Sequence, residues 1–372
     1  MENNNVQVSN HYIGIDVMRT IAIICVALSH FWEIGGTPFV GNTYLNTIIS
    51  YGGEIGVTLF FIISGFSIYC CINNKNNNFR YVGYLKDRLK RILPQYYFSI
   101  FILIIISEGA TYLSREGVIS IVLHIFLIHN LYLPTHGSIS GVLWSIGVIF
   151  QFYIIAPLLY KLIRKYALMT YICSIVSVIF FKYILFNYFA THYIEPSSYY
   201  FIYGRQIFTS LDNFVLGMCL GNCITKDNSC YKNKNAIIFF IITVFVGGLW
   251  YIKLSTGIVY SNTVYGYSWH SISAIVLAFI IYSLLKMDIE VYKNKFINLL
   301  IYISKYEYGI YIWHLIIANN LLSRSTIIQK LSLFNYWIYS IVLLAISIMS
   351  SIFFTKIIDC NLIRNRREIY GK

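Results

Sequence analysis

Charged residues are scarce in this sequence. Only 12% of its 372 residues are Asp, Glu, Lys or Arg, about half the share that a soluble globular domain carries. Hydrophobic residues make up 58% of the chain, and the mean hydropathy is +0.65. This composition excludes a water-soluble enzyme and predicts an all-α integral membrane protein that crosses the bilayer many times.

Acidic residues are scarcer than basic ones, with 15 Asp and Glu against 28 Lys and Arg, so the net charge is +13. In a soluble protein this excess would suggest a nucleic-acid partner. In a membrane protein the placement of the basic residues in loops matters more. We therefore expect contacts with membrane lipids and no nucleic-acid partner.

The cysteines lack the spacing of a metal or redox site. There are eight of them, but no Cys-x-x-Cys pair and no two cysteines in a loop expected outside the cell. We therefore expect no disulfide and no metal site. No Lys or Arg precedes Arg19, and the first apolar run is longer than the core of a signal peptide, so we expect the first span to be retained.

Apolar runs long enough to cross a bilayer recur along the whole chain. We expect about ten spans, both termini in the cytoplasm, and a single transmembrane domain over residues 1–372 without an appended soluble domain. The spans are expected at 13–32, 55–72, 92–107, 142–160, 167–186, 201–221, 236–252, 268–285, 308–322 and 336–357.

The segment 118–133 is apolar enough to form a further span. If it does not span, twenty-one Lys and Arg residues fall in loops on one side of the membrane and three fall in loops on the other. Such an asymmetry is typical of cytoplasmic loops, which are rich in Lys and Arg. We therefore expect residues 118–133 to form a re-entrant or surface helix on the outer side.

The first span carries three ionisable residues, Asp16, Arg19 and His30. Such groups are costly inside a membrane and usually face a protein interior or a wet cavity. Arg19 and His30 are eleven residues apart, about three turns, so they share one helix face roughly 16 Å apart, and Asp16 can pair with Arg19. The residues alone equally allow an Arg19 that reaches the inner surface and a His30 at the outer interface.

An arginine, ten residues and a histidine in an apolar first span resemble the opening motif of the membrane-bound acyltransferase-3 family. Members of that family are multi-span proteins that acylate carbohydrates at or beyond the membrane. Four further segments are similar to family motifs and occur in the same order. They are GVTLFFIISGF at 56–66, RLKRILP at 88–94, WSIGVIFQFYIIAP at 144–157 and YGIYIWHL at 308–315.

Arg88 and Arg91 are three residues apart and share a helix face. Paired guanidinium groups suit phosphate, although the residues alone favour an anchor to lipid head groups. The resemblance implies that the pair contacts an acyl-CoA donor, most simply acetyl-CoA, on the cytoplasmic side. We expect no bound cofactor.

Further residues are candidates for the wall of a substrate cavity. They are Asp16, Glu33, Ser64, Gly65, Trp144, Ser145 and His314. Glu33 follows His30 by three residues and could orient its imidazole. The residues alone favour plain helix packing for Ser64, and a hydrogen bond within the bundle accounts equally well for His314.

The chain departs from the family pattern at acidic positions. Ile149 stands where the family usually has a glutamate, Thr58 where many members have an acidic residue, and Glu307 where the family often has a serine. The missing glutamate leaves a non-catalytic member of the family as one reading of the sequence.

Other charges in the spans have no counterpart in the motifs. Arg205 and Asp212 are seven residues apart and share a face, which allows a structural ion pair or an acceptor site. We expect the structural pair, because no family motif reaches these two residues. Lys182 and Lys253 are expected to extend to the outer interface.

The resemblance implies an O-acyltransferase, most simply an O-acetyltransferase, in the cell (inner) membrane. It would move an acyl group from cytoplasmic acyl-CoA to a hydroxyl of a cell-surface polysaccharide, such as O-antigen or exopolysaccharide, or of its lipid-linked precursor. His30 is the expected catalytic base, assisted by Arg19. The alternative from another class is a transporter or flippase for a lipid-linked sugar, which spans with internal charges also fit.

Overall fold

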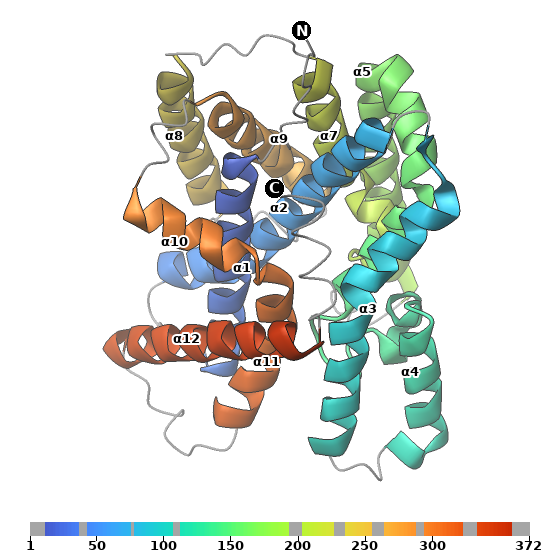
Figure 1. Cartoon of the computed structure of the whole chain (residues 1–372), viewed down its shortest axis with the longest axis vertical. Helices are drawn as coiled ribbons and strands as arrows, with labels where there is room; N and C mark the ends of the chain where they lie inside the picture. The colour runs from blue at the N-terminus through green and yellow to red at the C-terminus, as the bar shows by residue number, and fades with distance from the viewer. Residues whose placement is uncertain are drawn as a thin grey trace, which may run out of the picture.

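A computed structural model describes residues 12–36, 43–75, 78–106, 112–192, 203–226, 235–254, 264–287, 294–322 and 333–358. These residues form a bundle of helices and contain no strand (Figure 1). The helices are α1 Ile13–Ile34, α2 Thr43–Lys75, α3 Tyr81–Ile106, α4 Arg115–Ile125, α5 Trp144–His192, α7 Ile207–Lys226, α8 Ala236–Leu254, α9 Val264–Lys286, α10 Lys295–Ser304, α11 Glu307–Leu322 and α12 Leu333–Ile358.

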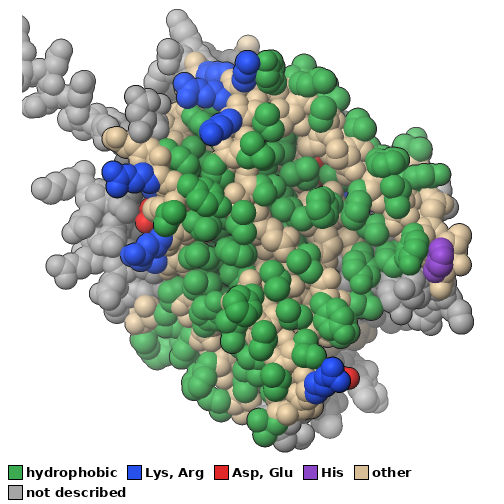
Figure 2. Space-filling view, turned by 90° about the vertical axis from the view of Figure 1, so that its right-hand side faces the viewer, with side chains coloured by type: hydrophobic (Ala, Val, Ile, Leu, Met, Phe, Trp, Pro, Cys, Tyr) green, Lys and Arg blue, Asp and Glu red, His purple; other side chains and the backbone are tan. Residues whose placement is uncertain are grey.

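Within the described ranges, eight helices are long and apolar enough to cross a membrane: α1, α2, α3, α5, α7, α8, α9 and α12. Hydrophobic side chains cover most of the face shown in Figure 2, and Lys and Arg gather toward its edges. This is the surface of a helix bundle surrounded by lipid. The predicted all-α membrane fold is confirmed.

The 49-residue helix α5 contains two of the predicted spans. A straight helix of this length would extend about 73 Å, more than twice the hydrocarbon core, but the backbone at Tyr166 leaves the helical region (φ −137°, ψ 54°). The chain reverses there. Trp144 of the first half lies under Arg205, which pairs with Glu54, and Glu54 interacts electrostatically with Lys182 of the second half. The predicted loop 161–166 is therefore a break within one helix.

The 16-residue helix α11 runs alongside α1, with Glu307 near Arg19 and His314 near His30. At about 24 Å it is slightly shorter than the hydrocarbon core. The eight long apolar helices give nine crossings when the two halves of α5 are counted separately. The tenth predicted span, 308–322, corresponds to α11, so the total of ten stays a prediction. The cytoplasmic location of the termini stays a prediction.

Three of the basic loops lie on one face of the bundle. The hydroxyl of Tyr160, next to the break in α5, donates to Asn73 near the end of α2 at 3.0 Å, and the Lys226 ammonium donates to the Arg164 carbonyl at 3.3 Å. We call this end of the bundle the basic face; its residues include Lys75, Lys161, Arg164, Lys165 and Lys226. The clustering agrees with a chain in which 118–133 does not span.

The helix α4 has 11 residues, too few to cross a membrane, and lies beside α3 (Figure 1). Ser114 caps its first turn by accepting from the Gly117 amide at 3.1 Å. The Tyr96 and Tyr97 hydroxyls of α3 donate to carbonyls at its last turn, at 3.0 and 2.7 Å. The chain then turns back at Leu127 (φ 58°). A surface or re-entrant helix is what the sequence predicts here.

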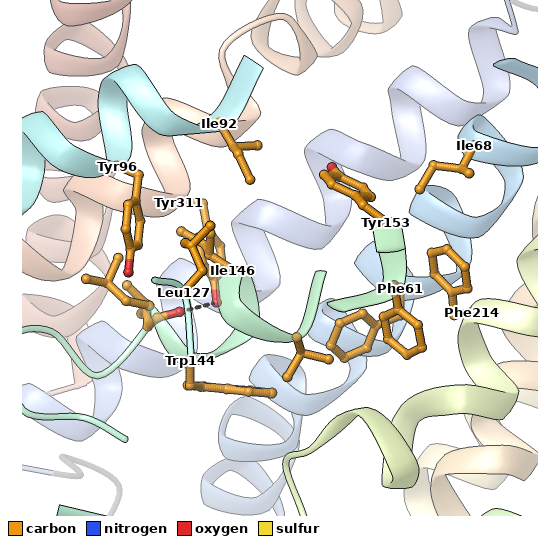
Figure 3. Packing of buried hydrophobic residues seen from close by; sticks show 14 of the residues in the cluster. Phe61, Ile68, Ile92, Tyr96, Leu127, Trp144, Ile146, Tyr153, Phe214 and Tyr311 are labelled. Carbon is orange, nitrogen blue, oxygen red and sulfur yellow. Dashed lines mark hydrogen bonds between the residues drawn. The ribbon is translucent and has the colours of Figure 1, made fainter. Parts of the chain in front are cut away.

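The helices α2 and α7 pack so closely that glycine is required at their contact. A Cβ on Gly65 would lie 2.1 Å from the Phe214 carbonyl oxygen, and one on Gly217 would lie 1.9 Å from the Ile62 carbonyl oxygen. The aromatic rings of Phe61 and Phe214 fill the core beside this contact (Figure 3). Gly65 therefore serves helix packing rather than the wall of a cavity.

Candidate active site

A cavity of about 880 Å³, including the space at its mouth, opens between α1, α2, α3, α5 and α11. Its wall contains five of the candidate residues from the sequence. They are Arg19, Ser64, Arg88, Arg91 and Ser145. Because these residues come from four helices, their meeting at one cavity is a property of the tertiary fold. We call it the active-site cavity.

Arg19 is held by three oxygen-bearing side chains. Its guanidinium lies 3.0 Å from Asp16 on its own helix, 2.8 Å from the Ser67 hydroxyl on α2 and 3.5 Å from Glu307 on α11. An arginine with planar donors can satisfy all three at once. Arg19 therefore points into the bundle and not along the surface, which favours the functional interpretation.

Glu307 is a cavity residue to which the sequence assigns no role. Its carboxylate joins Arg19 at 3.5 Å to Arg91 at 3.4 Å and so links the first and third helices. The sequence marks Glu307 as unusual, because the family often has a serine there. It does not show that Glu307 contacts Arg19 and Arg91, because these residues lie far away in the chain. Ile149 lines the same cavity. The acid that the family usually places at this position of α5 is missing here, and α11 supplies one instead.

Arg88 has spare hydrogen-bonding capacity. Its Nη2 donates to the Cys71 sulfur at 2.8 Å, and the guanidinium lies 5.8 Å from the centre of the Tyr84 ring. Its Nε is buried and has no hydrogen-bond partner among the described residues. A buried donor without a partner is costly, so an anion in the cavity would gain from it.

His30 and His314 form a pair at the other end of α1. Nδ1 of His30 lies 2.9 Å from Nε2 of His314, and Nδ1 of His314 lies 3.0 Å from the Ile310 carbonyl. A carbonyl only accepts, so His314 carries its proton on Nδ1 and its Nε2 accepts from His30. In the neutral pair, the His30 proton is therefore on Nδ1, and its Nε2 keeps a lone pair that can take a proton.

Tyr311 links the cavity to this pair. Its ring lines the cavity and lies 5.9 Å from the His314 ring. Its hydroxyl is 2.7 Å from the Ser145 hydroxyl. Figure 3 shows Tyr311 beside Ile146 of α5. The cavity thus ends one aromatic ring away from the two histidines, and its wall as observed does not contain His30.

The remaining candidates lie around the cavity and not in its wall. Asp16 holds Arg19, Glu33 is exposed, and His314 is fully buried against His30. Trp144 is buried with its ring 5.8 Å from that of His136.

A second group of charges lies deep in the bundle, and we call it the Glu54 cluster. It comprises Glu54 of α2, Lys182 of α5, Arg205, Asp212 of α7 and His270 of α9. Arg205 pairs with Glu54, the Lys182 ammonium lies 3.2 Å from His270, and Asp212 accepts from the Ser271 hydroxyl. The predicted Arg205–Asp212 pair is wrong, because both residues find partners on other helices. Lys182 is only 2% exposed, so the predicted extension to the interface is also wrong for it.

Three histidines lie in and after α4. The rings of His124 and His129 stack 3.8 Å apart, and burial lowers the pKa of His124 to about 4 and that of His129 to about 3. His136 stacks on Trp144. Within the part of the chain that the structure describes, no three His, Cys, Asp or Glu residues are arranged to hold a metal ion.

A family model and two known proteins are similar in sequence to this chain. A family model described as an acyltransferase domain matches residues 12–356. A Bacillus subtilis (strain 168) protein, YrhL, named as a candidate peptidoglycan O-acetyltransferase, is 30% identical over 161 residues. That match covers 39% of this chain and 23% of the relative, so the chain corresponds to less than a quarter of that protein.

A second relative is similar over most of its length. ORF330 of Acidianus two-tailed virus, named as a candidate acetyltransferase, is 23% identical over 310 residues, which cover 80% of this chain and 81% of the relative. No solved structure matches the chain. The family match extends from the residue before α1 to the last turns of α12 and includes every helix of the cavity. The chain therefore belongs to the membrane-bound acyltransferase-3 family.

Proposed function

We propose that this protein is an integral membrane O-acetyltransferase that uses acyl-CoA as donor and a hydroxyl of a cell-surface glycan, or of its lipid-linked precursor, as acceptor. The observation that carries the proposal is the arrangement along α1. Arg19 lies in a cavity with Arg88 and Arg91, and His30, three turns further on, is paired with His314.

The donor end of this arrangement is cationic. Arg19, Arg88 and Arg91 face Asp16 and Glu307, so the arginines exceed the carboxylates by one charge before a ligand enters. Guanidinium groups bind phosphate through a planar fork of donors. The two on α3 would hold the diphosphate of coenzyme A near the basic face, and Arg19 would act on the acyl-pantetheine arm deeper in the cavity.

The acceptor end supplies the base. As the hydroxyl oxygen of the acceptor bonds to the thioester carbonyl carbon, Nε2 of His30 takes the hydroxyl proton. The carbon–sulfur bond then breaks, and the departing thiolate takes this proton, which gives an ester and free coenzyme A. His314 fixes the His30 tautomer and accepts a hydrogen bond from its Nδ1–H throughout, so it is a positioning residue.

Because Tyr311 separates the cavity from His314, the acyl arm must pass this ring to reach His30. The Tyr311 hydroxyl bonds to Ser145 and to the Val142 carbonyl, at 2.7 and 3.0 Å. Rotation of the ring would break these two hydrogen bonds and its ring contacts with Phe60 and His314, and would open the path. The name of the Bacillus relative supports peptidoglycan or its precursors as the class of acceptor.

Transfer of a labelled acetyl group tests the proposal. The purified chain in detergent receives acetyl-CoA labelled in the acetyl group, together with soluble peptidoglycan fragments or O-antigen oligosaccharides. We expect label in the glycan and a matching release of free thiol, and neither from protein heated beforehand. A chain that moves a lipid-linked sugar across vesicles but releases no thiol from acetyl-CoA would be a transporter and would contradict the proposal.

A further inference from the structure

A second pocket adjoins the active-site cavity on the basic face. It has a volume of about 1,060 Å³, including its open mouth, and its wall contains Lys161, Arg164 and Lys165 from the break in α5. The aromatic residues Phe79 and Tyr160 also line it. We call it the basic pocket.

The two spaces follow each other along the same two helices. On α2 the cavity wall includes Ile68 and the basic pocket includes Ile72, while on α5 the cavity includes Tyr153 and the pocket includes Pro157. Each step is four residues, about one helical turn or 6 Å. The basic pocket is therefore the next space outward from the cavity.

The buried Tyr84 contacts a wall residue of each space, although it lines neither. The Tyr84 ring lies 5.6 Å from that of the pocket residue Phe79, and the guanidinium of the cavity residue Arg88 lies 5.8 Å from its centre. The Tyr84 hydroxyl is buried and has no hydrogen-bond partner among the described residues. Tyr84 therefore connects the walls of the two spaces.

The charges of the two spaces differ. In the cavity, Glu307 pairs with two of the three arginines. No carboxylate among the described residues pairs with Lys161, Arg164 or Lys165, whereas Lys75 nearby on the same face pairs with Asp87 at 2.9 Å. The pocket therefore holds three cations without a carboxylate and has room for a polyanion.

We propose that the basic pocket binds the 3′-phosphorylated adenosine end of the acyl-CoA donor. The inference rests on the proposed function, since it requires this donor. Coenzyme A carries a phosphate monoester at one end, a diphosphate in the middle and a nearly uncharged pantetheine arm. Three unpaired cations suit the monoester, Arg88 and Arg91 suit the diphosphate, and the less charged inner cavity suits the arm.

Comparison of coenzyme A with 3′-dephospho-coenzyme A tests the pocket. For the wild-type chain, purified in an uncharged detergent, we expect a dissociation constant for coenzyme A at least about tenfold lower than for 3′-dephospho-coenzyme A. The reason is that one charge-assisted contact with the additional phosphate contributes enough free energy for about a tenfold change. In a triple Lys161→Ala, Arg164→Ala, Lys165→Ala variant, this ratio should fall to within about twofold of one. Its affinity for the dephospho compound should stay that of the wild type, which also shows that the variant is folded.

Two matched variants separate the pocket from charge in general. Lys86→Ala, Lys90→Ala, Lys305→Ala removes three exposed lysines that line neither space, and it should keep the wild-type ratio. Arg88→Ala, Arg91→Ala should weaken both ligands and also keep the ratio, since it affects the diphosphate that both share.

The other source of the same phosphate chemistry is a lipid head group. Nanodiscs with and without phosphatidylglycerol distinguish the two. A triple variant that keeps the wild-type ratio and loses only stabilisation by the anionic lipid would overturn the inference. Equal affinity of the wild type for coenzyme A and 3′-dephospho-coenzyme A would also overturn the inference about the basic pocket, but would still agree with acyl-CoA as the donor. A wild type that binds neither compound would refute the proposed donor itself.

Discussion

Two groups of charged side chains lie inside this bundle, and they differ in what surrounds them. In the Glu54 cluster, two cations face two carboxylates, and none of the four lines the active-site cavity. Lys182 and Asp212 are buried, with 2% and 1% exposed, while the side chains of Arg205 and Glu54 are 23% and 16% exposed. In the active-site cavity, three arginines face two carboxylates beside about 880 Å³ of open space.

The difference shows how buried charge serves two purposes in one fold. A group with equal positive and negative charge, whose members pair with one another, fixes how its helices meet, because removing one partner would leave a charge without its counter-charge. An open group with an excess of one sign can still gain from a ligand. His30 lies between the active-site cavity and the Glu54 cluster. It is hydrogen-bonded to His314 on the side of the cavity and interacts electrostatically with Arg205 and Glu54.

The largest effect is expected at His30. Replacing it by Ala or Gln should abolish glycan acetylation, with a loss of about 10²–10⁴ in rate, because the base is gone. Label transfer at equal protein level measures this. His192→Ala, which removes an exposed histidine at the end of α5, should keep full activity. A well-expressed and active His30→Ala chain would contradict the mechanism.

Removing one partner of the Glu54 cluster should lower stability and leave donor binding unchanged. Glu54→Ala leaves Arg205 without its carboxylate in the bundle interior, which we expect to cost about 3–5 kcal/mol. Thermal unfolding in detergent reports the loss, and the affinity of the folded protein for coenzyme A is the second measurement. Unchanged stability with lost donor binding would reverse the comparison.

The complementary change in the cavity should weaken donor binding and leave stability nearly unchanged. Arg88→Ala with Arg91→Ala removes two charge-assisted contacts of about 1.5–3 kcal/mol each. Lysine at both positions should rescue only in part, since the planar fork is lost. Isothermal titration with coenzyme A measures the effect. Wild-type affinity of the folded double alanine variant would place the donor elsewhere.

A smaller effect of opposite sign is expected at Glu307. Its carboxylate partly neutralises the positive charge of Arg19 and Arg91. Glu307→Gln removes this negative charge and should therefore tighten coenzyme A binding by about 1 kcal/mol, roughly fivefold. Weaker binding by this variant would show that the carboxylate positions the arginines for the donor instead of competing with it.

The last prediction concerns the orientation of the chain in the membrane, and its test leaves every side-chain contact unchanged. The Lys and Arg asymmetry predicts that the basic face is cytoplasmic. Reporters fused at Asn77 and Asn233 should then read cytoplasmic, and at Asn42 and Ser261 external; these four positions lie outside the described residues. An external signal at Asn77 would invert the assignment of donor and acceptor ends.

The sequence by itself determined the features that depend on local spacing. Apolar length defines the spans, including the two halves of α5, and the counts of Lys and Arg indicate that 118–133 does not cross. The helical period places Arg19 and His30 on one face and Asp16 beside Arg19, and the structure has that contact at 3.0 Å. Each of these follows from the rise and turn of a single helix.

Only the tertiary structure decided which side chains meet across helices. The period of α7 allowed a pair between Arg205 and Asp212, yet their partners come from α2 and α9. Glu307 meets Arg19 from 288 residues away, and His30 meets His314 from 284. Such contacts depend on how closely the helices approach, for which the glycines between α2 and α7 are one cause. No spacing along one helix contains that information.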